Sequence, residues 1–164
     1  MLISVISDTH DNLPYIEKAI ARLNRLDPGL VIHCGDFSAP FAASPYSELR
    51  PPLIAVFGNN DAEKDMIKER LSRSGKKVMG SFTKIDIDNR KIAITHGDNL
   101  GLLDALIETQ AFDAICFGHT HRVTSVKKGN MVVLNPGEVC GYLTGNHTFA
   151  NINTSTMETK LIKL

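Results

Sequence analysis

The chain of 164 residues has no tryptophan, only three cysteines and no excess of charge of either sign. Its 18 lysines and arginines balance 18 aspartates and glutamates, which argues against a protein that binds nucleic acid through a broad positive surface. No apolar run approaches the roughly 20 residues of a membrane-spanning helix, so we expect no membrane contact. Against these absences stand six histidines and a length typical of one domain, which we expect to span residues 1–164.

The three cysteines, Cys34, Cys116 and Cys140, are odd in number and widely spaced. Two of them lie inside apolar runs, so we expect buried, reduced thiols and a cytoplasmic protein rather than a disulfide scaffold. The chain opens with a short apolar run at residues 2–7, with no basic stretch before it. This pattern predicts a strand rather than a signal peptide.

The first half of the sequence alternates short apolar runs with helical patterns, which is typical of an α/β fold. The apolar runs predict strands at residues 2–7, 30–34 and 53–57. Helical spacing predicts a helix at residues 13–26, with Asn12 as its cap and Pro14 in its first turn, and a second helix at residues 62–74. The segment 37–52 carries four prolines and predicts a loop with one weak helix.

The second half is dominated by hairpins. Pairs of strands are predicted at residues 82–87 with 91–95, 123–127 with 131–134, and 147–153 with 157–163. A helix at residues 101–111 and a buried strand at residues 114–117 lie between the hairpins. The whole pattern predicts two sheets packed together with helices on the outside.

Polar side chains follow the predicted strands one after another. Directly after five apolar strands come the residues Asp8, His10, Asp36, Asn59, His96, His119 and His121. Any one of these short patterns is better explained as a turn, a cap or a solvated side chain. Together they predict one built site, because ligands of α/β folds bind outside the carboxyl ends of the strands.

The chemistry of this set points to metal ions. Imidazole, carboxylate and amide oxygen suit divalent Mn, Fe, Co, Ni or Zn, and the lack of cysteine argues against a structural zinc site. Seven ligands exceed the needs of one tetrahedral ion. They suit two ions that share a carboxylate and lie about 3.5–4 Å apart, as in hydrolytic sites with two metals.

In this order, the motifs D-x-H, G-D, G-N-x-[D/E], H and G-H-x-H resemble those of the calcineurin-like metallophosphoesterases. The short length, the SDTHDNL opening and the late NPG resemble the small bacterial and archaeal phosphodiesterase branch. The resemblance implies a four-layer α/β/β/α sandwich of two mixed sheets. It also implies a phosphoesterase that acts on a small phosphodiester or phosphomonoester. Phosphodiesterase activity is the leading expectation.

The same resemblance assigns the ligands. Asp8, His10 and His121 would hold one ion, Asn59, His96 and His119 the other, and Asp36 both. Two divalent ions would activate a bridging hydroxide for direct in-line attack on phosphorus, and manganese is the first choice of metal. Small members of this family often form dimers or higher assemblies, which makes a homo-oligomer one expectation for this chain.

The sequence departs from the family pattern at three places. Asn60 stands where larger relatives carry a histidine that protonates the leaving group, so we expect a preference for good leaving groups. Asp61 follows and is expected to orient a neighbour rather than to bind metal. Asp98 replaces the second histidine of an H-G-H stretch, and Glu138 replaces the serine of N-P-G-S.

The remaining basic residues have simpler interpretations. His33 lies within a strand and is expected in the core, while His147 lies near a turn and is expected on the surface. Arg122, next to His121, could reach a phosphate.

Two other functions, a scaffold and a nuclease, fit the sequence less well. A scaffold like the retromer subunit of this fold would have a degraded metal site, whereas all ligand positions are intact here. A nuclease would be expected to carry a capping domain, the missing histidine and a cationic surface.

Overall fold

The computed structural model describes all residues from 1 to 164. Its helices are α1 (Leu13–Leu26), α2 (Lys64–Arg73), α3 (Leu100–Thr109) and the 3₁₀ helix η1 (Pro40–Glu48). Its strands are β1 (Leu2–Ile6), β2 (Leu30–His33), β3 (Leu53–Ala55), β4 (Lys77–Val78), β5 (Phe82–Ile87), β6 (Arg90–Thr95), β7 (Ala114–Cys116), β8 (Thr124–Lys128), β9 (Met131–Asn135), β10 (Thr148–Asn153) and β11 (Glu158–Lys163). None of the helices combines the length and the apolar character that a membrane crossing requires.

The strands form two mixed sheets. The first has the order β11-β10-β1-β2-β3-β4, in which β1 to β4 are parallel and the β10–β11 hairpin pairs antiparallel with β1. The second has the order β5-β6-β7-β9-β8, with β6, β7 and β9 parallel in its centre and an antiparallel hairpin at each edge. Each sheet therefore contains a set of adjacent parallel strands, and the carboxyl ends of these strands lie at the same end of the sheet.

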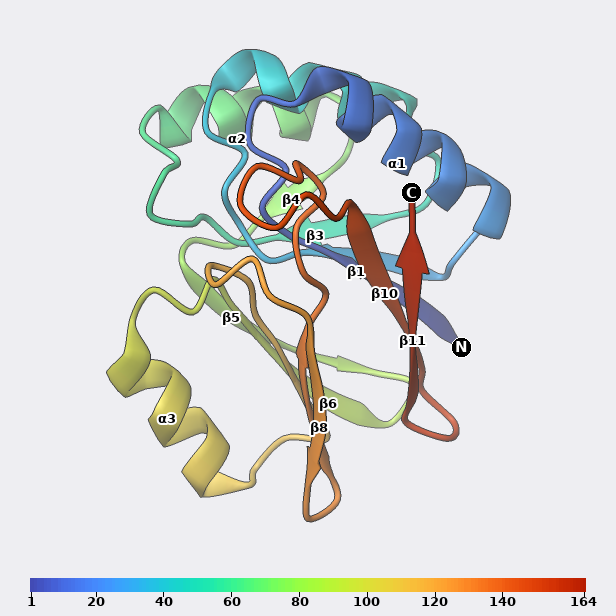
Figure 1. The fold of residues 1–164 in the computed structure, drawn as a ribbon, viewed down its shortest axis with the longest axis vertical. Helices are drawn as coiled ribbons and strands as arrows, with labels where there is room; N and C mark the ends of the chain where they lie inside the picture. The colour runs from blue at the N-terminus through green and yellow to red at the C-terminus, as the bar shows by residue number, and fades with distance from the viewer.

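The sheets pack face to face, and helices cover both outer faces (Figure 1). Side chains alternate along each strand. Ile3 and Val5 of β1 join Ile92 of β6 in the core between the sheets. Ile6 instead packs with residues of α1, α2 and η1, and Ala93 packs with α3. These three separate cores confirm the expected α/β/β/α layers.

Most predicted elements agree with the structure to within a residue or two. Helix α1 has the predicted bounds, with Pro14 in its first turn. Helix α2 begins two residues later than predicted, and the two-residue strand β4 was not expected, since two residues show no periodicity. The proline-rich segment forms η1, in which Pro45 lies inside the helix. A 3₁₀ helix tolerates this sequence because it has no regular α-helical ladder to break.

All three cysteines are free and buried, as predicted. The Asn12 prediction was half right, because Asn12 occupies the cap position of α1 but its side chain makes no capping hydrogen bond. Its amide nitrogen donates instead to the carbonyl oxygen of Cys140 at 2.8 Å. This bond ties the start of α1 to the loop that follows β9.

Candidate metal centre

Five loops that follow parallel strands bring the seven predicted ligands into one cluster. The first three members lie together, with His10 Nε2 at 3.5 Å from His121 Nε2 and His121 Nε2 at 3.4 Å from Asp8 Oδ1. The ring planes of the two histidines are nearly parallel, with centroids 5.2 Å apart. Asp8 and His121 are buried and His10 is half-buried.

The second group assembles around an amide oxygen. Asn59 Oδ1 lies 3.1 Å from His96 Nε2 and 2.9 Å from His119 Nδ1. His96 is fully buried, while Asn59 is exposed and His119 is half-buried. This group therefore opens to solvent on the Asn59 side.

Asp36 lies between the two groups. Its Oδ2 is 3.3 Å from His96 Nε2 and 3.8 Å from His10 Nε2. One carboxylate thus contacts a member of each group, which is the arrangement that a shared ligand requires.

The backbone at these positions is unusual. Asp8, His10, Asp36, His119 and His121 all have positive φ angles, between 45° and 66°. Left-handed backbone is uncommon for non-glycine residues and costs on the order of 1–3 kcal/mol at each position. The strain turns each side chain back toward the cluster where its strand ends. Five of the eleven non-glycine residues with positive φ are candidate ligands, and such strain is typical of functional sites.

Two glycines leave room for the carboxylates. A Cβ on Gly58 would collide with the carboxyl group of Asp36. A Cβ on Gly118 would collide with Ser7 Oγ and would lie 2.6 Å from Asp8 Oδ2. Both carboxylates therefore pack against bare backbone, which no other residue type would provide.

The chemistry of the cluster fits divalent cations. Asp8 and Asp36 are buried, yet every ion pair that they form is to a histidine, and none is to lysine or arginine. Asp8 Oδ1 has no hydrogen-bond partner at all. Buried carboxylates require a compensating charge. The imidazole, carboxylate and amide donors gathered here are those that bind Mn, Fe, Co, Ni or Zn.

The pKa values of the clustered side chains reflect the same crowding. Burial raises the pKa of Asp8. Burial also raises the pKa of Asp36, but the charge of His96 and hydrogen bonds from His96 and Asn60 lower it by more, so that it falls well below its usual range. Burial lowers the pKa of His96, whereas the hydrogen bond to Asp36 and the charge of Asp36 raise it, to a net value of about 9. Asp36 and His96 therefore each favour the charged form of the other.

Three of the histidines are held from behind through Nδ1. The Nδ1 atom of His96 donates to the carbonyl oxygen of Cys34 at 2.8 Å, and that of His121 donates to Glu138 Oε2 at 2.7 Å. The Nδ1 atom of His10 lies 2.8 Å from Ser38 Oγ. A histidine whose Nδ1 carries the proton presents the lone pair of Nε2 to a metal ion.

Asp61 organises the loop that carries Asp36. Its carboxylate accepts hydrogen bonds from the backbone N–H groups of Asp36 (3.0 Å), Phe37 (2.7 Å), Ser38 (2.8 Å) and Gly58 (2.8 Å). Its side chain is nearly inaccessible to solvent. These contacts connect the loop after β2 with the loop after β3.

Asn60 holds the carboxylate of Asp36. Its backbone nitrogen donates to Asp36 Oδ1 at 2.9 Å, and its side-chain amide donates to Asp36 Oδ2 at 2.8 Å. An amide in this position cannot supply a proton to a leaving group.

Two contacts around the cluster were not predicted. Ser38 was not singled out, and no local pattern marks it. In the sequence, Glu138 is recognisable only as a departure from the N-P-G-S pattern of the family. Its position directly after the NPG sequence is the one signal that could have found it.

The other basic residues have mixed outcomes. His33 is buried as predicted, stacks on Phe37 with centroids 3.8 Å apart, and has a pKa that burial lowers to about 3. The prediction of a surface His147 was wrong. This residue is half-buried, its ring stacks on Tyr15, and its Nδ1 donates to the Val139 carbonyl at 2.9 Å. Arg122 is exposed, and its side chain makes no hydrogen bond or ion pair.

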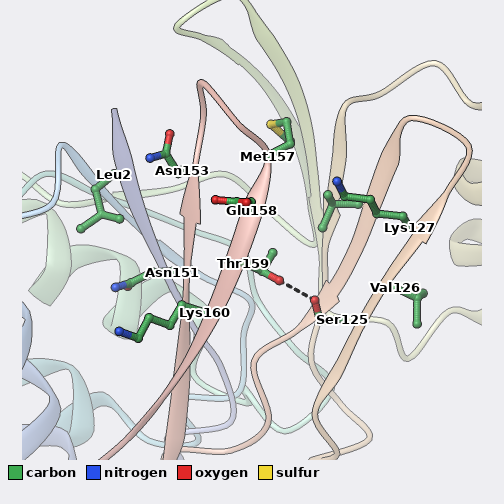
Figure 2. Close-up of a pocket in the computed structure, with 11 residues that line it drawn as sticks. Leu2, Ser125, Val126, Lys127, Asn151, Asn153, Met157, Glu158, Thr159 and Lys160 are labelled. Carbon is green, nitrogen blue, oxygen red and sulfur yellow. Dashed lines mark hydrogen bonds between the residues drawn. The ribbon is translucent and has the colours of Figure 1, made fainter.

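A separate groove lies between the edge strands β8 and β11 (Figure 2). A hydrogen bond of 2.6 Å between Ser125 Oγ and Thr159 Oγ1 joins the two strands there. Leu2, at the amino end of β1, lines this groove, whereas the cluster lies at the carboxyl end of the same strand. The groove contains no histidine and only one carboxylate, that of Glu158, so the metal chemistry does not extend to it.

Comparison with known proteins places this geometry in a family. The calcineurin-like phosphoesterase superfamily domain matches residues 1–157. A phosphodiesterase of Methanocaldococcus jannaschii is 39% identical over 165 residues, which cover 100% of this chain and 99% of the relative. A probable metallophosphoesterase of Bacillus subtilis is 32% identical over 85% of this chain and 75% of its own length.

Solved structures agree. An archaeal phosphodiesterase superposes with a TM-score of 0.95 at 39% identity, over 100% of both chains. The zinc complex of Vps29 from Entamoeba histolytica shares the fold, with a TM-score of 0.73 at 20% identity over 100% of this chain and 98% of the other. The chain therefore belongs to the calcineurin-like phosphoesterase superfamily.

Proposed function

We propose that this protein is a metal-dependent phosphodiesterase that works with two divalent ions. The observation that carries the proposal is the position of Asp36, whose Oδ2 lies 3.3 Å from His96 and 3.8 Å from His10. Asp8, His10 and His121 would hold one ion, while Asn59, His96 and His119 would hold the other. The archaeal phosphodiesterase at 39% identity supports the activity.

When bound, the two ions would supply a nucleophilic water near neutral pH and neutralise charge on the phosphoryl oxygens. The protein's own contribution is positioning. Asp61 fixes the backbone of the Asp36 loop, and Asn60 fixes the carboxylate itself. Because the candidate ligands lie in one cluster, ion binding needs little rearrangement of the chain.

The leaving group is the limiting feature of this site. Asn60 is engaged with Asp36 and has no acidic proton, so it cannot assist departure of an alkoxide. A positioned general acid typically contributes about 10²–10⁴-fold. We therefore propose that small phosphodiesters with good leaving groups, such as aryl diesters, are the preferred substrates.

The carboxylate, imidazole and amide donors suit manganese, nickel, iron, cobalt and zinc. Manganese is the ion that we propose from this group. The balance of 18 basic and 18 acidic residues argues against a nucleic-acid substrate that binds through bulk charge.

The test is hydrolysis of bis(4-nitrophenyl) phosphate and of 4-nitrophenyl phosphate by chelator-treated protein, with and without added Mn²⁺. We expect release of 4-nitrophenol only with Mn²⁺ and a higher kcat/KM for the diester. Asp36→Asn should lose activity by more than the roughly 10–100-fold typical of groups that merely support a metal ligand. Asp104→Asn, an exposed change on α3, is the matched control and should leave activity intact.

Equal inactivity of wild type and Asp36→Asn under all conditions would contradict the proposal. Such a result, together with no bound metal, would favour the scaffold alternative, for which the Vps29 structures provide a precedent in fold.

A further inference from the structure

Glu138 lies in the loop after β9, fully buried and without a lysine or arginine partner. Its carboxylate accepts hydrogen bonds from five groups. The donors are His121 Nδ1 (2.7 Å), Cys140 Sγ (3.0 Å), Leu143 N (3.2 Å), Thr144 N (2.6 Å) and Thr144 Oγ1 (2.7 Å). The backbone N–H groups of Leu143 and Thr144 can only donate, and together they reach both oxygens, so Glu138 is assigned as a carboxylate anion independently of His121.

The contact with His121 fixes the tautomer of that ring. A carboxylate can only accept, so Nδ1 of His121 carries the proton and Nε2 carries the lone pair. Nε2 is the atom that faces Asp8 and His10, at 3.4 Å and 3.5 Å. Glu138 thus determines which nitrogen of His121 is available to an ion.

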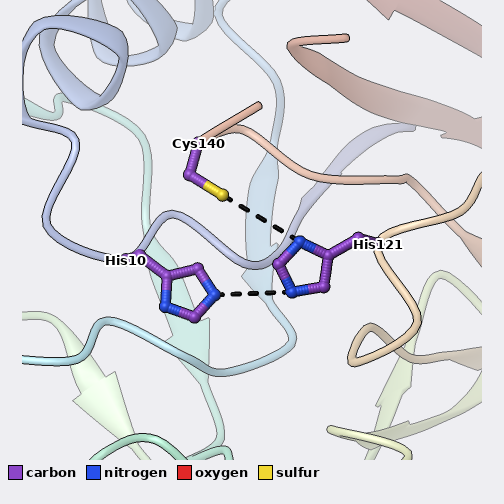
Figure 3. Close-up of side chains that lie close together, drawn as sticks. All are labelled: His10, His121 and Cys140. Atoms are coloured by element: carbon purple, nitrogen blue, oxygen red, sulfur yellow. Dashed lines mark hydrogen bonds between the residues drawn. The ribbon is translucent and has the colours of Figure 1, made fainter. Parts of the chain in front are cut away.

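Cys140 belongs to this support rather than to the ligand set. Figure 3 shows that one nitrogen of His121 faces His10 and the other faces Cys140. Cys140 Sγ lies 4.0 Å from His121 Nδ1, on the side of the ring away from His10, and its thiol donates to Glu138. The cysteine therefore completes the hydrogen bonding of the carboxylate.

The same carboxylate also holds an exposed loop beside the site. The amides of Leu143 and Thr144 both donate to Glu138, although the Leu143 side chain is 73% exposed. Between them and Cys140, Tyr142 donates from its hydroxyl to Asp11 at 2.8 Å, and its ring lies 6.1 Å from that of His10. The loop 142–144 thus forms a wall next to the first group of ligands.

We propose that Glu138 is a positioning residue that couples ion binding at His121 to the order of the loop 142–144. This inference rests on the proposed function only in that His121 is taken to bind an ion. With an ion bound, Nδ1 of His121 would be a stronger donor to Glu138 and would hold its carboxylate in a fixed position. A fixed carboxylate would in turn leave the amides of Leu143 and Thr144 better ordered.

The first test compares Glu138→Gln with wild type. The amide keeps the shape of the side chain but removes the charge and half of the acceptor capacity. We expect Zn²⁺ affinity, measured by competition with a chromogenic chelator, to fall about 10–100-fold. In ¹⁵N-histidine NMR spectra of the metal-free wild type, His121 should be protonated at Nδ1, and this tautomer should be lost or mixed in the variant.

Glu108→Gln is the matched control, because it makes the same change of carboxylate to amide at an exposed position on α3, away from the site. It should change Zn²⁺ affinity by less than about 3-fold and leave the tautomer unchanged. Unchanged affinity and an unchanged His121 tautomer in Glu138→Gln would overturn the positioning role.

A second measurement needs no variant and covers the case in which Glu138→Gln fails to fold. In the wild type, Zn²⁺ should raise the hydrogen-exchange protection of the Leu143 and Thr144 amides about 10-fold or more. Unchanged protection at saturating Zn²⁺ would refute the coupling. Since these readouts are binding, tautomer and exchange, a protein that binds zinc but hydrolyses nothing would contradict only the proposed function.

Discussion

Replacing Asp61 by asparagine should destabilise the protein and disturb the metal centre together. Oδ1 of Asp61 accepts from the amides of Phe37 and Ser38, and Oδ2 accepts from those of Asp36 and Gly58. In Asp61→Asn, an NH₂ group takes the place of one oxygen and faces two N–H donors.

The magnitude follows from those two orphaned donors. A buried donor without a partner costs about 1–3 kcal/mol, which gives about 2–6 kcal/mol for the pair. Burial raises the pKa of Asp61 even with the backbone N–H groups lowering it, so the charge itself carries a cost that the variant removes. This moves the expected loss to the lower half of the range, about 2–4 kcal/mol.

For a domain of this size, each kcal/mol lowers Tm by about 2–4 °C, so the melting temperature of the metal-free protein should fall by about 4–16 °C. Calorimetry of wild type, Asp61→Asn and the exposed control Asp104→Asn measures this loss. Zn²⁺ affinity should fall as well, because the loop that carries Asp36 loses its anchor. A melting temperature and an affinity equal to those of Asp104→Asn would refute the role assigned to Asp61.

Three further predictions concern the leaving group, the buried imidazole and the space around Asp8. Asn60→His should raise turnover of diesters with poor leaving groups by up to about 10²-fold while changing aryl diesters little, as measured by steady-state kinetics; no rise for the poor leaving groups contradicts the account. The pKa of His33 falls to about 3 on burial, so between pH 6.5 and pH 3 the unfolded chain takes up a proton that the folded chain does not. The free energy of unfolding should therefore decrease as the pH falls through that window, by up to about 1.4 kcal/mol per pH unit. Urea titrations at several pH values should show a smaller decrease in His33→Gln than in the wild type; an equal decrease in both proteins speaks against this assignment. Gly118→Ala should weaken metal binding and lower Tm, because its Cβ would collide with Ser7 and approach Asp8, whereas Gly101→Ala on α3 should be neutral or slightly stabilising. Equal metal affinity and Tm in the two variants would show that Asp8 does not need the space left by Gly118.

The fold could be predicted largely because its strands are apolar runs and its first helix is amphipathic. Helix α1 combines buried Ile16, Ala19, Ile20 and Leu23 at helical spacing, and its bounds follow from that spacing. Strand β4 could not be predicted, because two residues carry no period. The surface prediction for His147 failed because its stacking partner, Tyr15, lies at the other end of the sequence.

The candidate ligands could be found for a similar reason. Each follows an apolar strand directly, and parallel strands that end on one edge must bring such residues together. The support behind them leaves no such mark. Ser38 and Glu138 contact His10 and His121 across loops whose paths depend on the packed structure, and a serine or glutamate in a loop has no distinctive spacing.

The central claim, that this cluster holds two ions shared through Asp36, is tested most directly by metal content. Purified protein would be stripped with chelator, dialysed against Mn²⁺ and then against metal-free buffer, and analysed by mass spectrometry for metal per chain. We predict about two ions per chain for the wild type and at most about one for Asp36→Asn, with diester hydrolysis rising in step with occupancy. A wild type that retains no metal, or that hydrolyses the diester equally well after stripping, would contradict the account.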